Sequence, residues 1–86
     1  MSHSAMMELP LYDCHKQVRA CLIKEVRALH LQLIPADEKL APIELDQQYF
    51  DKHRPQAGGY FVVYEDGYKS YSPAEAFEGG YKLHAE

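Results

Sequence analysis

The clearest pattern of hydrophobic and polar positions lies between Gly58 and Tyr81. The run Tyr-Phe-Val-Val-Tyr at residues 60–64 has apolar side chains on both faces, which predicts a central strand rather than an edge strand. The pair at residues 66–67, Asp-Gly, predicts a two-residue type I′ turn, because both central residues of that turn need a positive φ. Residues 68–71 then form the returning strand of a β-hairpin.

The segment after the hairpin predicts a short helix followed by a strand. Ser72 as N-cap, Pro73 at the first helical position and Glu75 at the third form a capping box. The Gly-Gly pair at residues 79–80 predicts a left-handed C-cap, and residues 81–83 can rejoin the sheet.

Residues 11–33 contain neither Gly nor Pro and fit two patterns. Helical spacing gathers the apolar residues into one stripe, and intrinsic propensity favours a helix. Spacing of two instead places Val18, Ala20 and Leu22 on one face of a strand and the residues between them on the other. The pattern alone leaves both structures open.

The middle of the chain predicts short elements separated by turns. Pro35 begins a turn over residues 35–38, and residues 42–45 alternate as in a short strand. Asp46 is a good N-cap for a helix over residues 47–53, which Pro55 ends.

These elements predict an α+β fold with a small antiparallel sheet of three to five strands and one or two short helices. Residues 1–10 are expected to be a flexible leader or an expression remnant, and residues 11–86 a single domain. A chain of 86 residues buries a modest share of its surface, so self-association is expected to add stability.

Composition limits the kinds of partner that are expected for this protein. The net charge is −4, with nine lysines and arginines, so a face that binds duplex nucleic acid is not expected. No stretch approaches the roughly 20 apolar residues of a membrane span, so no membrane partner is expected. The two cysteines and the absence of an apolar signal region predict a cytoplasmic protein.

The motifs for catalysis and metal binding are missing. The cysteines and histidines lack the paired spacing of structural zinc sites. No family signature surrounds Cys14 and His15, and no glycine-rich phosphate loop occurs. The sequence therefore predicts a protein that is not an enzyme and that carries neither a metal nor a cofactor.

The tyrosines are the remaining feature. Seven occur, and four lie between residues 60 and 71. They fit two interpretations: cross-strand aromatic pairs that stabilise the sheet, or a stacking platform for a ligand. Basic side chains would complement such a platform by binding an anion, although solvated surface roles are the commoner outcome. The predicted ligand-binding residues are His15, Lys16, Arg19, His53, Arg54, Tyr60, Tyr64 and Tyr68.

Three segments carry a resemblance to known proteins. They are His-Lys-x-Val-x-Ala at residues 15–20, Pro-x-x-Gly-Gly-Tyr-Phe-Val at residues 55–62, and the run from Tyr64 to Tyr81 with its Ser-Pro-Ala-Glu-Ala-Phe-Glu helix. Over residues 12–83 the chain resembles a group of short proteins, mostly without an assigned function, that tailed phages and prophages encode. In the resembled group the segment that matches residues 18–23 is a strand, so the resemblance favours the strand there.

The resemblance implies a function in an infected or lysogenic bacterial host. It suggests a counter-defence protein that binds and sequesters a small phosphate-bearing ligand, such as a nucleotide-derived immune signal. The alternative is an inhibitor or adaptor that masks a host or phage protein with its acidic surface. That surface would comprise Asp37, Glu38, Glu65, Asp66, Glu75 and Glu78.

Overall fold

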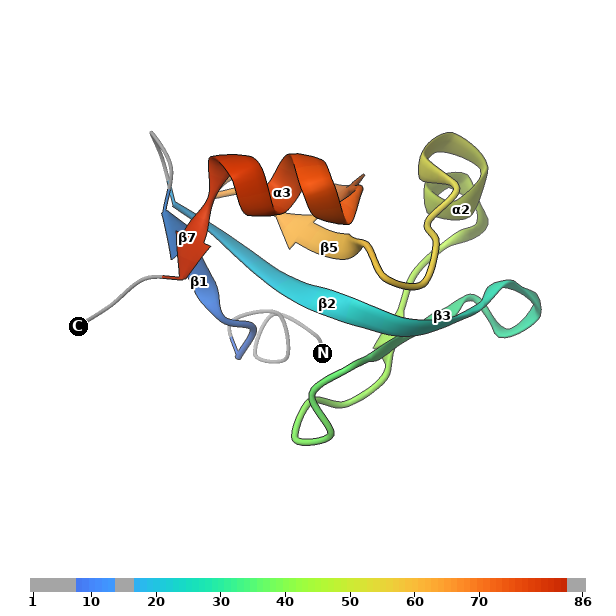
Figure 1. Ribbon diagram of the computed structural model, residues 1–86. Coiled ribbons are helices and arrows are strands. Elements are labelled where there is room, and N and C mark those ends of the chain that lie inside the picture. The colour runs from blue at the N-terminus through green and yellow to red at the C-terminus, as the bar shows by residue number, and fades with distance from the viewer. Residues whose placement is uncertain (1–7, 14–16, 84–86) are drawn as a thin grey trace.

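A computed structural model describes residues 8–13 and 17–83, and shows one curved sheet with two helices (Figure 1). The elements follow the chain as β1 Leu11–Asp13, β2 Gln17–Arg27, the 3-10 turn η1 Ala28–His30, β3 Gln32–Pro35, β4 Ile43–Glu44, α2 Gln47–His53, β5 Tyr60–Val63, β6 Lys69–Ser72, α3 Ala74–Gly80 and β7 Lys82–Leu83.

The sheet is organised around the long strand β2. β1 pairs with the beginning of β2, β3 pairs with its end, and β5 pairs with it between residues 19 and 22. The register shifts between Ile23 and Glu25, where β2 passes from one set of partners to the other. β4, β6 and β7 extend the sheet, and every pairing is antiparallel.

The α+β class is confirmed, but the expected three to five strands are too few, since the described residues form a sheet of seven strands. The additional strands are short: β1 has three residues and β3 has four. Segments of this length are too short to show a recognisable alternation of apolar and polar residues, so the sequence does not mark them as strands. Their pairing depends on neighbours that are distant in sequence.

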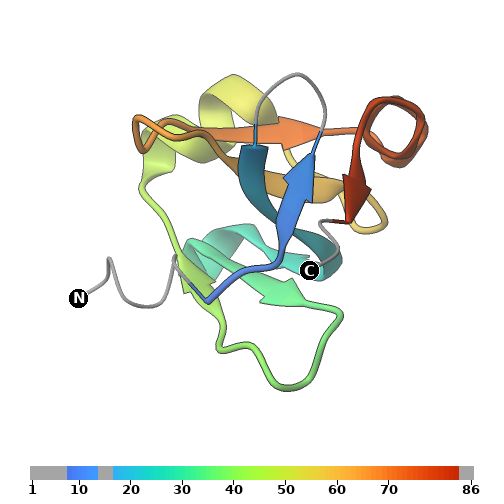
Figure 2. The same cartoon turned by 90° about the vertical axis from the view of Figure 1, so that its left-hand side faces the viewer.

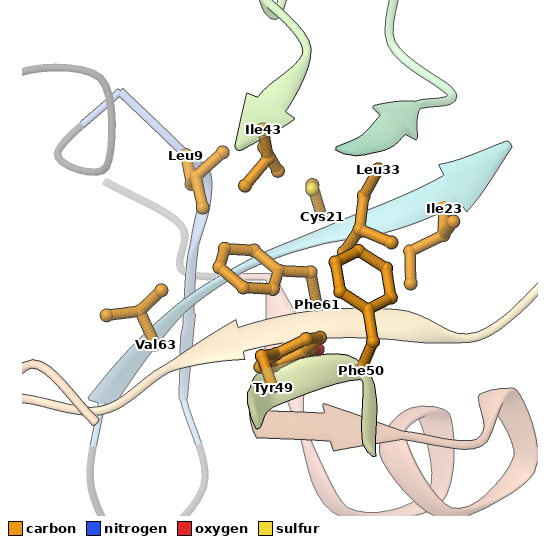
Figure 3. Close-up of a cluster of buried hydrophobic side chains, with 9 residues drawn as sticks. All are labelled: Leu9, Cys21, Ile23, Leu33, Ile43, Tyr49, Phe50, Phe61 and Val63. Carbon is orange, nitrogen blue, oxygen red and sulfur yellow. The ribbon is translucent and has the colours of Figure 1, made fainter. Parts of the chain in front are cut away.

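The larger core lies on one face of β2 and β5. Cys21, Ile23, Phe61 and Val63 point into it from the two strands, and α2 covers it with two aromatic side chains (Figure 3). Leu9 also packs there and is 3% exposed, although the sequence assigned it to the leader.

The opposite face of the same strands packs against α3. Val18 and Ala20 of β2 and Val62 of β5 meet Phe77 of α3, whose side chain is 1% exposed. The helix therefore covers this face of the sheet, and Figure 2 shows α3 end-on beside the strands. Val18 and Ala20 are thus buried on one face of β2, and Cys21 and Ile23 on the other. Burial on both faces explains why residues 18–23 form a strand despite their helix propensity.

Several local predictions are confirmed. β4 forms within residues 42–45, the chain turns after Pro35, and residues 82–83 rejoin the sheet beside β1. The Asp46 carboxylate accepts a hydrogen bond from the Tyr49 backbone N–H at 2.9 Å, which makes Asp46 the N-cap of α2.

The predicted type I′ turn is wrong. The left-handed positions are Leu31, Arg54, Gly58 and Gly67, so Asp66 lacks the positive φ that this turn requires. The Tyr64 carbonyl instead accepts from the Gly67 N–H, and the Tyr64 N–H donates to the Tyr68 carbonyl. This pattern is a three-residue loop with Gly67 at its left-handed position, and the Asp66 carboxylate accepts from the Tyr68 N–H at 3.0 Å.

Both predicted caps of α3 are also wrong. Pro73 is the N-cap and no side chain caps the helix, because the Ser72 hydroxyl donates to the Pro73 carbonyl instead. At the other end the helix runs through both glycines without a positive φ and ends at Tyr81, whose backbone is extended.

Candidate functional site

One cross-strand row defines the strongest candidate site. The pairings place Leu11 opposite Arg19, Arg19 opposite Val63, and Val63 opposite Lys69. Directly opposite residues share a face of the sheet, so two basic side chains flank an apolar floor. Arg19 and Lys69 are two strands apart, or about 10 Å between backbones at the usual spacing of neighbouring strands.

The row forms the floor of a hollow of about 400 Å³, which we call the Arg19–Lys69 hollow. The rest of its lining comes from the start of β2 and the tip of the β5–β6 hairpin: Gln17, Val18, Tyr64, Glu65, Asp66 and Gly67. Its volume falls within the range of about 300–1,000 Å³ that is usual for small-molecule sites.

Arg19 is held in place by a backbone contact. Its Nη1 donates to the Leu9 carbonyl at 2.9 Å, which leaves the other guanidinium N–H groups available for a ligand. Lys69 is exposed and its ammonium carries three donors. Arginine and lysine together are the usual residues for binding a phosphate or a carboxylate.

A second hollow lies on the α2 side of the same hairpin tip and is called the His53 hollow. The Tyr68 hydroxyl lies 3.3 Å from His53 Nε2, and the Lys52 ammonium lies 5.1 Å from the centre of the Tyr68 ring. The His53 ring also packs on Tyr49 at 4.7 Å between centroids. Burial lowers the pKa of the His53 imidazole, and the charge of Lys52 lowers it further.

The acidic residues around the His53 hollow oppose anion binding. Its lining includes Glu44 and Asp46 beside Lys52, His53 and Lys69, so Lys69 borders both hollows. The imidazole favours its neutral form, so His53 adds little positive charge near neutral pH. Two carboxylates, Glu65 and Asp66, also line the Arg19–Lys69 hollow, so the carboxylates do not distinguish the two hollows. The Arg19–Lys69 hollow is the stronger phosphate site because it alone contains an arginine, whose planar guanidinium can bind two phosphate oxygens at once.

The eight predicted ligand-binding residues separate in space. Arg19 and Tyr64 line one hollow, whereas His53 and Tyr68 line the other. Arg54 is the left-handed C-cap of α2 and belongs to the lining of neither. His15 and Lys16 lie outside the described residues.

Tyr60 belongs to the core rather than to a ligand platform. It is 8% exposed, its ring stacks on Phe77 at 4.3 Å between centroids, and its hydroxyl donates to Glu78 at 2.8 Å. Burial raises the pKa of the Tyr60 hydroxyl, and the bond to the Glu78 carboxylate adds to the effect. The Tyr60 side chain therefore fits the first of the two interpretations, aromatic packing that stabilises the fold.

Sequence reasoning missed Lys69 and Lys52. Lys69 was hidden by the wrong turn, because a two-residue loop at 66–67 would have paired it with Tyr64 on the other face. A one-residue slip moves every side chain of a strand to the opposite face. Lys52 was not among the predicted residues, and nothing in the sequence indicates its contact with Tyr68.

Metal-ligating side chains and the Cys21 thiol are the remaining reactive groups of the described residues. Within residues 8–13 and 17–83, no group of three or more metal-ligating His, Cys, Asp or Glu side chains comes together. Cys21 is buried in the larger core, and burial raises the pKa of its thiol to about 12. A thiol in that state is a poor nucleophile.

Comparisons with known proteins match no family model, no curated protein and no solved structure. Within the described part of the chain, no helix is long and apolar enough to cross a membrane.

Proposed function

We propose that the protein is a non-catalytic binding protein that holds a small phosphate-bearing ligand in the Arg19–Lys69 hollow. One observation carries the proposal: the cross-strand row from Leu11 to Lys69 sets two cations on either side of an apolar floor. Such a floor suits the body of a ligand, and the flanking cations suit its phosphates.

The resemblance to phage-encoded proteins suggests the biological use of such a site. A protein that binds a nucleotide-derived immune signal without turning it over would lower the free concentration of that signal. Counter-defence by sequestration in the host cytoplasm is therefore the role that we propose.

The alternative, an inhibitor that masks a partner with its acidic residues, has less support. Asp37 and Glu38 lie in the connection between β3 and β4, whereas Glu75 and Glu78 belong to α3. These two segments lie on opposite sides of the sheet (Figure 1). The six acidic residues therefore do not share the single face that this function requires.

The test is a thermal-shift and calorimetric screen of the full chain with cyclic nucleotides, cyclic dinucleotides and ADP-ribose derivatives. A ligand at 100 times its Kd stabilises the folded state by about 2.7 kcal/mol. For a domain of this size, each kcal/mol raises the Tm by about 4–8 °C, so a true ligand gives a clear shift. The absence of a shift across the screen would contradict the proposal.

Charge variants locate the binding. Arg19→Gln and Lys69→Gln are each expected to weaken it about tenfold or more, since hydrogen bonds to charged groups contribute about 1.5–3 kcal/mol. Arg19→Gln assigns the binding to this hollow, because Lys69 also borders the His53 hollow. Lys24→Gln is the matched control, because it removes the same charge from an exposed position of β2 outside the hollow. Native mass spectrometry of the purified protein tests the expected self-association and any ligand that copurifies.

A further inference from the structure

A third hollow lies at the hairpin tip and is lined mainly by tyrosines. We call it the tyrosine hollow; its volume is about 580 Å³. Its lining residues come from the hairpin tip and from the residue that follows α3: Tyr64, Glu65, Asp66, Tyr68 and Tyr81. Three aromatic residues and two carboxylates thus meet at one surface depression.

Packing holds the tyrosines of this hollow in place. The rings of Tyr64 and Tyr68 are nearly parallel, with 23° between their planes and 6.1 Å between their centroids. The Tyr81 ring stacks on Phe77 of α3 at 4.7 Å. Tyr68 nevertheless remains 43% exposed, so part of its surface is accessible to a ligand.

The chemistry of this lining favours a cation. The faces of aromatic rings carry negative potential, and a cation within about 6 Å of a ring centre is attracted to it. The Lys52 ammonium already occupies such a position, 5.1 Å from the centre of the Tyr68 ring. Lys52 reaches Tyr68 from α2 and is not among the residues that line the tyrosine hollow.

Two acidic residues add charge to the rings. Glu65 is exposed at the tip of the loop, and the Asp66 carboxylate is held there by the Tyr68 N–H. The protein as a whole carries a net charge of −4, which attracts cations over a longer range.

We infer that the tyrosine hollow binds a methylated ammonium group. An unmodified ammonium is compact and strongly hydrated, so it loses much of its hydration when it moves onto aromatic rings. Methyl groups reduce that loss and spread the charge over a larger apolar surface, which suits an aromatic lining. The group can belong to a free molecule of the choline type or to a methylated lysine side chain.

This inference is independent of the proposed anion site, although the two hollows share the loop between β5 and β6. Glu65 lines both of them. Its charge opposes an anion in the Arg19–Lys69 hollow and favours a cation in the tyrosine hollow. Glu65→Gln is therefore expected to strengthen the first binding and to weaken the second.

The experiment is an NMR titration of the full chain with tetramethylammonium and with choline, followed through the tyrosine ring signals. Sodium chloride at the same concentrations corrects for ionic strength, and 3,3-dimethylbutan-1-ol serves as the neutral analogue of choline. The expected result is saturable shifts of Tyr68 and Tyr81 with both cations and weaker shifts with the alcohol. Equal shifts with the alcohol, or none beyond those caused by sodium chloride, would overturn the inference.

Variants test the role of the rings. Tyr68→Leu is expected to weaken cation binding by about threefold to thirtyfold, the range that one cation–π contact contributes. Tyr68→Phe keeps the ring and is expected to retain the binding. Unchanged binding in both Tyr68→Leu and Glu65→Gln would overturn the inference, and Glu65→Gln keeps the test valid if Tyr68→Leu fails to fold.

Peptides distinguish the two sources of the cation. A peptide with one trimethyl-lysine is compared with the same peptide carrying an unmodified lysine, and with choline. Tighter binding of the methylated peptide than of choline assigns the hollow to a protein side chain, and the reverse order assigns it to a free molecule. Equal binding of the two peptides contradicts the preference for methylation. Lys69→Gln, which is expected to weaken phosphate binding, leaves this cation binding intact, so the two proposals can fail separately.

Discussion

Gly59 and Tyr71 provide a quantitative test of the packing between β5 and β6. Gly59 lies just before β5, and a Cβ atom added there would meet the side-chain ring of Tyr71, at 2.6 Å from Cζ. Tyr71 is half-buried and packs against the larger core, so its ring cannot turn away without losing that contact. Gly59→Ala should therefore destabilise the protein through overpacking.

The magnitude follows from two opposing terms. Extra atoms in a packed region cost about 1–3 kcal/mol. Replacing glycine by alanine returns about 0.4–1 kcal/mol, because the unfolded chain loses conformational freedom. The net loss of unfolding free energy is about 0–2.6 kcal/mol from these two terms.

A double-mutant cycle isolates the contact. In the Tyr71→Ala background the overpacking term disappears, so Gly59→Ala should be neutral or stabilising by about 0.4–1 kcal/mol. Urea denaturation followed by circular dichroism measures all four proteins, and constant m-values show that the transition stays two-state. An equal loss from Gly59→Ala in both backgrounds would refute the reasoning, because the cost would then come from the backbone and not from Tyr71.

Three further predictions concern single residues. His53 has a lowered pKa when folded, so the unfolded chain binds its proton more readily and stability should fall as the pH drops below about 6.5. The Tm difference between the wild type and His53→Asn, measured from pH 7.5 to pH 5, should reveal this loss, and parallel Tm profiles would contradict it. Burial raises the pKa of the Cys21 thiol to about 12, so in a Cys14→Ser background it should resist a thiol reagent at pH 8 until denaturant is added. Rapid labelling of the native protein would contradict its burial. Asp46→Ala should lower the unfolding free energy by about 1 kcal/mol through loss of the helix cap, whereas Asp37→Ala in an exposed turn changes it less; equal losses in urea titrations would argue against the cap.

The sequence predicted those elements whose local signals agree with their tertiary surroundings. The run at residues 60–64 contains β5, a central strand. Its β-branched and aromatic residues favour a strand, and apolar side chains on both faces suit a strand that is covered on both sides. Asp46 caps α2 through a hydrogen bond from the backbone N–H three residues later. This contact is local in sequence, so it needs no tertiary partner.

The remaining elements depend on contacts between distant parts of the chain. Residues 18–23 have helix propensity, yet pairing with β1 and β5 and burial on two faces make them a strand. The short strands β1 and β3, which the local pattern did not mark as strands, form against the two ends of β2.

The candidate site was predictable in its residue types but not in its arrangement. Arg19 and Tyr64 were both candidate residues and line the same hollow, whereas the partner of Arg19 across the hollow depends on the hairpin register. Asp-Gly suits a type I′ turn and also a three-residue loop with glycine at the left-handed position. The choice between these loops decides whether Lys69 faces the hollow, and local sequence does not make that choice.

The central claim is that a phosphate-bearing ligand occupies the hollow between Arg19 and Lys69. The most direct measurement is an NMR titration with the nucleotide that gives the largest thermal shift, followed at the Arg19 Nε–H and the Lys69 Nζ signals. The account predicts saturable shifts at both side chains and unchanged signals from Lys52 and His53. Shifts confined to Lys52 and His53 would place the ligand in the other hollow and contradict the claim.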